Sequence, residues 1–494
     1  MHSSPSRVPG AISPDLEPVR DTGEKARLII LADMGHDPDE EQQISHLLIC
    51  SNRLDIEGLI AVTGRFFRPN PTERVKTLRP HLFHYLIDGY AVDYPNLKLH
   101  AGGWPDPEYL RGIVARGQED NGVADTGVGK SSAGSKLIVD AVDRRDPRPI
   151  HIIINSGANT LAQALFDVRA TRSEEEVAAF VSKLRVYENS GQDDAGPWIL
   201  NQFPSIHWIK AVQQNRCYGG PSNKVLGPHV WAPFPYSPEG QHAWATVNIQ
   251  TRHGALGSLY CDRVVYGRNS LITHYIEGGG TIPFMGLVAR GLDAFDYPWW
   301  GGWSGRYSRE RRENVLSHFP ILHEEEKRYF PFTAYSDESG ISDTWTDPVS
   351  GESYDSVYAA TWRWRRAMWN DFKCRMDWAV QPYDRANHHP VAAVGNDVSD
   401  SILKAVVRPG QALAFDASDS EDPDGDPLVY SWFIYTEAGT YSGAVPLTAA
   451  NSEAVSLTVP KDASGTEIHL ILDVSDRNPI ASLHDYRRVV LEVE

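Results

Sequence analysis

The sequence predicts an α/β protein in which a mostly parallel sheet, with helices on both faces, is followed by a smaller β-sandwich. Over the first four-fifths of the chain, short apolar runs alternate with stretches whose apolar residues recur at helical spacing. Beyond about residue 385 the pattern changes to short alternating strands separated by turns. A chain of 494 residues also exceeds the size at which one hydrophobic core usually stops growing, so we expect at least two domains.

Four apolar runs in the first part have the length and composition of buried parallel strands. Because the carboxyl ends of parallel strands meet at one edge of a sheet, polar residues that follow these runs are expected to converge there. The predicted strands occupy residues 27–32, 56–63, 149–154 and 183–186, and helical periodicity is found at residues 71–88, 132–142, 160–166 and 354–379.

The last part of the chain is typical of an immunoglobulin-like β-sandwich, with Trp432 on a central strand. Its acidic turn at residues 422–426, DPDGD, suits either calcium or a tight solvated turn. We favour the turn because the downstream Glu of an EF-hand loop is missing. We predict a disordered leader at residues 1–26, an α/β domain at 27–384 and the sandwich at 385–494.

Charge and hydropathy narrow the range of partners. The formal net charge of −18 disfavours a nucleic-acid partner, which would need clustered Lys and Arg. Apolar stretches fall short of the roughly 20 residues that span a bilayer, so we expect no membrane partner. The leader shows no apolar segment of a secretory signal. The four cysteines are too widely spaced to indicate a zinc site or a disulfide framework; they are Cys50, Cys217, Cys261 and Cys374.

An acidic loop follows the first predicted strand and carries Asp33, Asp37 and Asp39. Carboxylates at this density repel one another unless a cation or protons intervene, and hard oxygen ligands suit calcium or magnesium. The alternative is a helix start, with Asp37 as the N-cap and Glu40 as its capping-box partner. The segment alone leaves the two interpretations equally favoured.

Two further loops follow predicted strands. Asn155 comes directly after the strand at 149–154, and Gln192, Asp193 and Asp194 follow the strand at 183–186. Carboxylate and amide side chains suit sugar hydroxyls, whereas the alternative is a solvated turn before a helix; the position at a strand end favours a site. For Trp303, stacking on a sugar and packing in the core are equally favoured.

Three motifs resemble the nucleoside hydrolase superfamily: ADMGHDPD at 32–39, IAVTGR at 60–65 and INSGANTLA at 154–162. The chain from residue 27 onward more closely resembles a branch of that superfamily. Its members are described as nucleoside hydrolase-like domains of cellulose-binding or carbohydrate-related proteins, followed by an immunoglobulin-like domain. The additional matching motifs are SGQDDAGPW at 190–198, GGWSGRY at 301–307 and the DPDGD turn.

The resemblance implies a calcium ion held by the acidic loop and by a backbone carbonyl near Ser156. It implies catalytic roles for Asp33, as general base, and for Asp37. It implies that Arg65 contacts the substrate, because Arg65 stands where the superfamily has a sugar-contacting Asn. It implies the same for Glu277, the nearest counterpart of a metal-binding carboxylate found late in the superfamily sequence. The other predicted substrate contacts are Asn155, Gln192, Asp193, Asp194 and Trp303.

Two departures from the superfamily pattern bear on the chemistry. Pro38 separates carboxylates that are adjacent in nucleoside hydrolases, and the late His-Asp pair has no clear counterpart. We therefore predict a glycoside hydrolase acting on a furanosidic or related glycosidic bond of a carbohydrate. The alternatives are a non-catalytic carbohydrate-binding protein and a nucleoside N-ribohydrolase. We expect an extracellular or periplasmic location, and homo-oligomers, which are common among nucleoside hydrolases.

Overall fold

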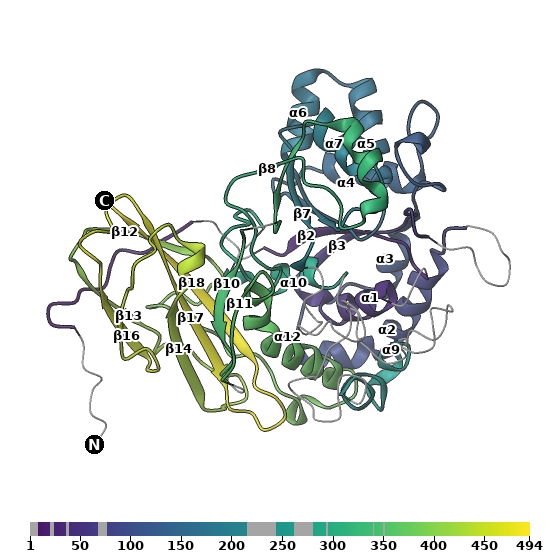
Figure 1. Cartoon of the computed structure of the whole chain (residues 1–494). Coiled ribbons are helices and arrows are strands. Elements are labelled where there is room, and N and C mark those ends of the chain that lie inside the picture. The colour runs from purple at the N-terminus through teal and green to yellow at the C-terminus, as the bar shows by residue number, and fades with distance from the viewer. Residues whose placement is uncertain are drawn as a thin grey trace.

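The computed structural model describes residues 8–19, 24–35, 39–67, 77–214, 244–260, 280–292, 295–338, 340–348 and 351–494. Within these ranges an α/β domain lies beside a β-sandwich (Figure 1). The predicted fold class is confirmed. None of the helices in these ranges combines the length and the apolar character that a membrane span requires.

The α/β domain is built on one sheet, which has eight strands in the described part of the chain. All neighbouring pairs are parallel except β8 with β9 at one edge. In the order of the sheet, the strands are β4 (Val114–Arg116), β3 (Leu54–Ala61), β2 (Ala26–Ala32), β5 (Ile150–Ile154), β6 (Leu184–Asn189), β7 (His207–Ala211), β9 (Thr333–Ser336) and β8 (Arg312–Glu313).

Helices cover both faces of this sheet, as the apolar strands require. Leu28 and Ile30 of β2 pack into a core with α1, α2, α10 and α12, whereas Ile29 and Leu31 pack with α4, α5, α6 and α7 on the other face (Figure 1). The helices are α1 (Asp39–Ile49), α2 (His81–His100), α3 (Pro107–Gly112), α4 (Ala133–Asp143), α5 (Asn159–Thr171), α6 (Glu174–Ser182), α7 (Ala195–Gln202), α9 (Gly254–Ser258), α10 (Ile282–Val288), α11 (His323–Glu326) and α12 (Ala359–Trp378).

Several predicted elements have different bounds in the structure. The strand expected at 56–63 is Leu54–Ala61, the helix expected at 160–166 is Asn159–Thr171, and the helix expected at 354–379 begins only at Ala359, because Ser353–Ser356 form a strand. The helix expected at 71–88 is α2, which begins after Pro80 and runs on to His100; residues 68–76 lie outside the described residues. Strand β6 continues past the predicted end at residue 186 to Asn189, because Glu188 pairs with Ile154 and Lys210 within the sheet.

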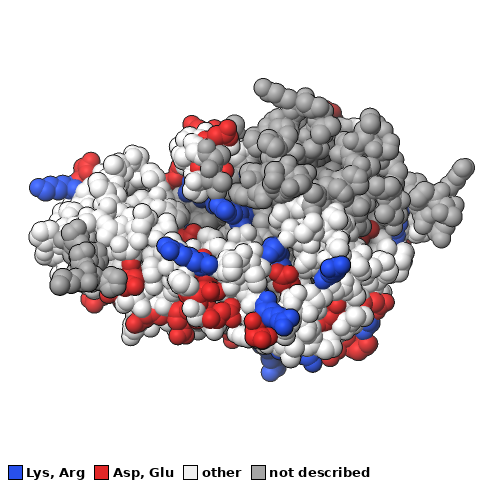
Figure 2. All heavy atoms as spheres, turned by 90° about the horizontal axis from the view of Figure 1, so that it is seen from below, with Lys and Arg blue, Asp and Glu red and all other residues white. Residues whose placement is uncertain are grey.

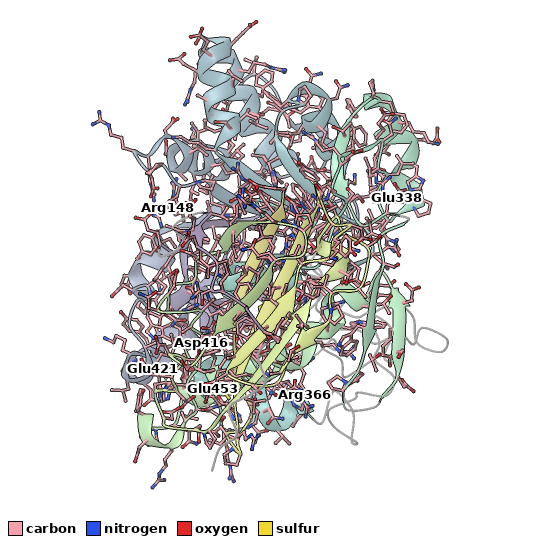
Figure 3. The ribbon with its side chains drawn as sticks, turned by 90° about the vertical axis from the view of Figure 1, so that its left-hand side faces the viewer. Arg148, Glu338, Arg366, Asp416, Glu421 and Glu453 are labelled. Atoms are coloured by element: carbon pink, nitrogen blue, oxygen red, sulfur yellow. The ribbon has the colours of Figure 1, made fainter. Side chains whose placement is uncertain are left out.

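The sandwich consists of a five-stranded and a three-stranded sheet within the described residues. Trp432 is buried between them, but the central strand expected for it is wrong, because its strand β14 (Leu428–Ile434) lies at one edge of the five-stranded sheet. Figure 3 views the molecule from the sandwich side, with Asp416, Glu421 and Glu453 labelled there. One sheet contains β1 (Glu17–Pro18), β12 (Leu403–Val407), β18 (His484–Val493), β17 (Glu467–Asp476) and β14 (Leu428–Ile434); the other contains β13 (Ala412–Asp416), β16 (Ala454–Thr458) and β15 (Leu447–Thr448).

Part of the predicted leader belongs to the sandwich. We expected residues 1–26 to be disordered, but β1 pairs antiparallel with β12, and Ile12 forms a bridge with Leu413. The physical reason is that β12 would otherwise leave an open sheet edge, which an extended segment of chain can cover by backbone hydrogen bonds.

The two domains share a continuous interface. Tyr435, Ile471 and Tyr486 of the sandwich belong to the same hydrophobic core as α1 and α12. Fully buried Arg488 donates hydrogen bonds to the carbonyls of Leu292, Trp300 and Gly301 in the α/β domain. A short hairpin, β10 (Asp343–Thr346) and β11 (Ser353–Ser356), contacts α12. On the face shown in Figure 2, acidic and basic side chains lie interspersed over the described surface.

Candidate functional site

Polar residues follow three adjacent strands at the carboxyl edge of the sheet. Asp33 comes directly after β2, Asn155 and Ser156 directly after β5, and Gln192 three residues after β6. Since β2, β5 and β6 are neighbours in the sheet, these residues converge at one edge, as the sequence predicted. Asp33, Asn155 and Ser156 are almost fully buried, whereas Gln192 is partly exposed.

The Asn155 side chain is held by a residue that the sequence did not indicate. Its Nδ2 donates a hydrogen bond to Oε1 of Gln43 on α1. Gly280 closes over this pair, because a Cβ at that position would lie 2.5 Å from Gln43 Oε1 and 3.1 Å from Asn155 Nδ2. The remaining amide atoms, Asn155 Oδ1 and Gln43 Nε2, are buried and have no hydrogen-bond partner among the described residues.

Gln192 and Ser156 form the adjoining part of the site. Ser156 Oγ donates to Gln192 Oε1 at 3.2 Å, and Gln192 Nε2 donates to the backbone carbonyl of Asn155 at 3.1 Å. The backbone N–H of Arg65 donates to the Gln192 carbonyl at 2.8 Å, which brings the loop after β3 against the loop after β6. Gly64 makes this approach possible, because a Cβ there would lie 3.0 Å from Gln192 Oε1 and would overlap Ser156 Oγ.

The Arg65 side chain lies at the rim of the site. It is exposed and forms an ion pair of 3.7 Å with Glu325, whose side chain is also partly exposed. An exposed pair of this kind contributes little stability, so the guanidinium can exchange this partner for a ligand at small cost.

Asp193 and Asp194 were predicted to contact substrate, but their described contacts are with the protein itself. Asp193 accepts backbone N–H groups from Gly122, Ala158 and Ala195 at 3.0–3.1 Å. Burial, reinforced by the charge of Asp194, raises the pKa of Asp193 to about 7 against the effect of these hydrogen bonds. Asp194 accepts the N–H of Val123 at 2.8 Å. The two carboxylates therefore fix the loops around the site.

Trp303, predicted to contact substrate, lies at the domain interface. Its indole packs edge-on against Tyr486 of the sandwich, with ring centroids 6.1 Å apart, and only 3% of the residue is exposed. These surroundings match core packing, and Trp303 also lines part of a cavity between the two domains. Two other predicted site residues, Asp37 and Glu277, lie outside the described residues.

Some of the oxygen atoms at this edge of the sheet are of the kind that bind a hard cation. Carboxylate oxygens of Asp33 and Asp39 and the amide oxygen of Asn155 are buried, and oxygen is the ligand that calcium takes. Within the described ranges, however, no three acidic, histidine or cysteine side chains gather around Asp33. A complete cage for six to eight oxygens would therefore have to include Asp37 or backbone carbonyls.

The acidic turn of the sandwich has the contacts of a tight turn. One carboxylate oxygen of Asp422 accepts the backbone N–H groups of Asp424 and Asp426 at 2.9 and 3.0 Å. Asp424 in turn accepts from the backbone N–H and the ring Nδ1 of His388. The three carboxylates lie close enough together to share an ion, although each already has a partner in the protein.

A buried ionic cluster lies beneath the site. Lys210 Nζ on β7 is 2.9 Å from Glu326 Oε1 and 3.5 Å from Glu188 Oε2, and none of the three side chains is exposed. Trp208 Nε1 donates to Glu188, and the backbone N–H of Ser317 donates to Glu326. Burial raises the pKa of Glu188, while the two carboxylates raise the pKa of Lys210 against the effect of its own burial. The cluster ties β6 and β7 to α11.

A parallel sheet with polar loops at its carboxyl edge, joined to a β-sandwich, defines a nucleoside hydrolase-like protein with an appended domain. The family model described as cellulose-binding Sde182, nucleoside hydrolase-like domain, matches residues 27–307. A second model, the C-terminal domain of cellulose-binding protein Sde0182, matches residues 412–493. The chain belongs to this family, and the resemblance inferred from its motifs is confirmed.

A solved structure agrees with this assignment. A nucleoside hydrolase-related hypothetical protein from Saccharophagus degradans, associated with carbohydrate metabolism, is 35% identical, with a TM-score of 0.79. The match covers 95% of this chain and 100% of that one. An endo-fucoidan hydrolase from glycoside hydrolase family 107 is 11% identical over 95% of this chain and 67% of that one, and its TM-score of 0.16 shows that the two folds differ. No match was found among curated proteins.

Proposed function

We propose that this protein binds a neutral saccharide at the carboxyl edge of its sheet, between the loops that follow β2, β5 and β6. The observation that carries the proposal is the pair of amide atoms left over at Asn155 and Gln43. Oδ1 of Asn155 is an acceptor and Nε2 of Gln43 is a donor, and within the described part of the chain neither buried atom has a partner. A sugar hydroxyl both donates and accepts, so it can satisfy the two groups together.

The surroundings support a polyhydroxylated ligand. Ser156 and Gln192 add a hydroxyl and a second amide, and Arg65 brings five donors to the rim. The carboxylates of Asp193 and Asp194 bind backbone N–H groups, so they are less suited to activate a water molecule. The family description, cellulose-binding, makes β-1,4-linked glucose the first ligand class to test. A polymeric ligand of this kind would place the protein outside the cytoplasm, which cell fractionation can test.

Hydrolysis of a furanosidic or related glycosidic bond is the second candidate, and Asp33 is the residue that favours it. Its carboxylate lies fully buried at the end of β2. Cleavage of a glycosidic bond develops positive charge on the sugar ring, which a nearby carboxylate stabilises. A calcium ion bound through Asp33, Asp37 and Asp39 would supply a Lewis acid at this position.

Calorimetry with cellotetraose tests the primary proposal. The Asn155→Ala variant should lose binding at the site, since the acceptor and its Gln43 contact are removed together. Asn201→Ala is the matched control, because Asn201 lies on α7, away from the site, where its amide donates to the carbonyl of Pro331 and accepts from Gln202 Nε2. Equal binding by both variants would contradict the proposal. Release of reducing sugar by the wild type, abolished in Asp33→Asn, would establish the second candidate.

A further inference from the structure

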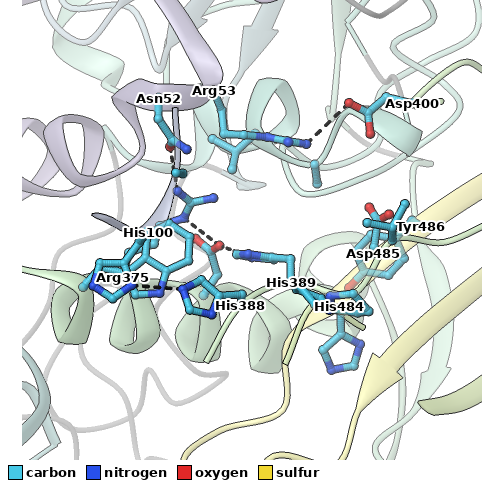
Figure 4. A pocket seen from close by; sticks show the side chains of 18 of the residues that line it. Asn52, Arg53, His100, Arg375, His388, His389, Asp400, His484, Asp485 and Tyr486 are labelled. Atoms are coloured by element: carbon cyan, nitrogen blue, oxygen red, sulfur yellow. Dashed lines mark hydrogen bonds and ion pairs between the residues drawn. The ribbon is translucent and has the colours of Figure 1, made fainter. Parts of the chain in front are cut away.

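A cavity of about 500 Å³ lies between the two domains, away from the carboxyl edge of the sheet. Arg53 and Asn52 come from the α/β domain, and Asp400, Asp485 and Tyr486 come from the sandwich (Figure 4). A volume of this size is within the range of small-ligand sites. Since both domains contribute walls, the cavity exists only when they are packed together.

Polar and charged side chains from the two domains face one another across this cavity. Arg53 makes a single ion pair among the described residues, to Asp400 at 3.5 Å, which is at the outer limit of a hydrogen bond. One oxygen of Asp485 accepts the backbone N–H of Ala392 at 2.8 Å. A guanidinium with five donors therefore lies near carboxylates that can accept from a ligand.

An aromatic wall lies at the other end of the cavity. The ring of Tyr383 stacks on the imidazole of His388 with centroids 3.9 Å apart, yet 41% of Tyr383 remains exposed. His388 is fixed by Asp424 at 2.8 Å on one ring nitrogen and by His100 at 3.0 Å on the other. The tyrosine ring is thus held in one orientation with part of its surface open to a ligand.

The charges of the lining favour a neutral ligand. Asp371 is paired with Arg375 at 2.8 Å and with His389 at 2.7 Å, so this cluster is internally compensated. The lining also contains Arg53 together with the carboxylates of Asp400 and Asp485. Because the lining has no excess of positive charge, it does not attract an anion. Adjacent hydrogen-bond donors and acceptors suit the hydroxyl groups of a sugar, and the aromatic ring suits the apolar face of a pyranose.

We propose that this interdomain cavity is a second saccharide-binding site, which takes a one- or two-unit stretch of a neutral glycan. The ligand class rests on the proposed function, but the residues are separate from those at the sheet edge. Tyr383 supplies the stacking surface, and Arg53 with Asp400 and Asp485 supplies the hydrogen bonds. Two sites on one chain would let it hold a polysaccharide at two points, which increases the apparent affinity without additional contacts at either.

Calorimetry of the full chain with cellotetraose tests this proposal through stoichiometry. Wild-type protein should bind two molecules per chain, and Tyr383→Ala should bind one, with at least a tenfold loss of affinity at the second site. Tyr85→Ala is the matched control, since Tyr85 on α2 is 54% exposed and does not line the cavity. Arg53→Gln is a second variant, expected to weaken the same site because it removes the guanidinium while keeping a polar side chain.

The variants separate this inference from the proposed function. Loss of all binding in Asn155→Ala, with Tyr383→Ala and Arg53→Gln behaving as Tyr85→Ala does, would overturn the second site and leave the first. Unchanged binding in Asn155→Ala with loss in Tyr383→Ala would overturn the first site and leave the second. Absence of any binding by wild-type protein would overturn both.

Discussion

Lys210 Nζ lies 2.9 Å from Oε1 of Glu326, and neither side chain is exposed to solvent. A second carboxylate, that of Glu188, is 3.5 Å from the same nitrogen. The lysine thus joins β7 to the end of β6 and to α11, directly against Gly191, the residue before Gln192. The geometry of the candidate saccharide site at the sheet edge therefore depends on a buried ionic contact that lies entirely within the protein.

Lys210→Met should destabilise the protein strongly. Removing the ammonium leaves two buried carboxylates without compensation, and breaking a buried pair typically costs about 3–5 kcal/mol. Urea denaturation measures the change in the free energy of unfolding. The control is Lys327→Met, which removes an exposed pair with Glu324 and should cost under about 1 kcal/mol. Similar losses in both variants would contradict a structural role for the buried cluster.

Stability should fall as the pH rises through the range in which Asp485 ionises. Burial, with the charge of Asp400, raises the pKa of Asp485 from 3.8 to about 6 against the effects of Arg53 and of the Ala392 hydrogen bond. The folded state therefore binds this proton more tightly than the unfolded state. The resulting contribution to stability is complete below pH 3.8 and is lost as the pH rises to about 6.

Asp485→Asn should flatten this part of the pH profile, measured as the free energy of unfolding at intervals from pH 4 to pH 7. The exposed Asp384→Asn substitution serves as control and should leave the profile as in the wild type. An unchanged slope in Asp485→Asn would show that another group is responsible.

Calcium should raise the melting temperature if the acidic loop holds the ion, because a ligand bound only by the folded state stabilises it. At a calcium concentration about 100 times Kd, the gain is about 2.7 kcal/mol. Differential scanning fluorimetry in calcium and in EDTA measures the shift, which Asp33→Asn should abolish. Asp422→Asn distinguishes the second acidic cluster: loss of the shift there, but not in Asp33→Asn, would place the ion in the sandwich turn.

The sequence could predict which loops meet at the sheet edge, because each signal is local. The apolar runs that become β2 and β5 end immediately before Asp33 and Asn155. In a parallel sheet, strand polarity alone then places these residues on the same edge. Neighbouring strands bring them together without any need to know the loop conformations.

Contacts between distant segments could not be predicted in this way. Gln43 and Asn155 are separated by 112 positions, and Gln43 reads in sequence as an ordinary polar residue of an amphipathic helix. Arg53 and Asp400 are 347 positions apart and meet only because the domains pack together. Asp193 fits a ligand-binding carboxylate by sequence, but three backbone N–H groups, two of them from loops distant in the chain, already occupy it.

Gly64→Ala should disturb the saccharide site at the sheet edge through a single added methyl group. A Cβ at position 64 would overlap Ser156 Oγ and would lie 3.0 Å from Gln192 Oε1 and 3.2 Å from Gln192 Cβ, so one of these side chains must move. Overpacking of this kind typically costs about 1–3 kcal/mol. Cellotetraose binding at this site should weaken at least tenfold, because the displaced groups belong to its polar lining.

The matched control is Gly112→Ala, since a Cβ at the end of α3 would meet no atom within 4 Å. Calorimetry and urea denaturation of both variants separate the effect on binding from the effect on folding. Weaker binding in Gly64→Ala, with binding by Gly112→Ala unchanged, would locate the saccharide beside Ser156 and Gln192. Full binding by a folded Gly64→Ala variant would show that the ligand does not use these two side chains.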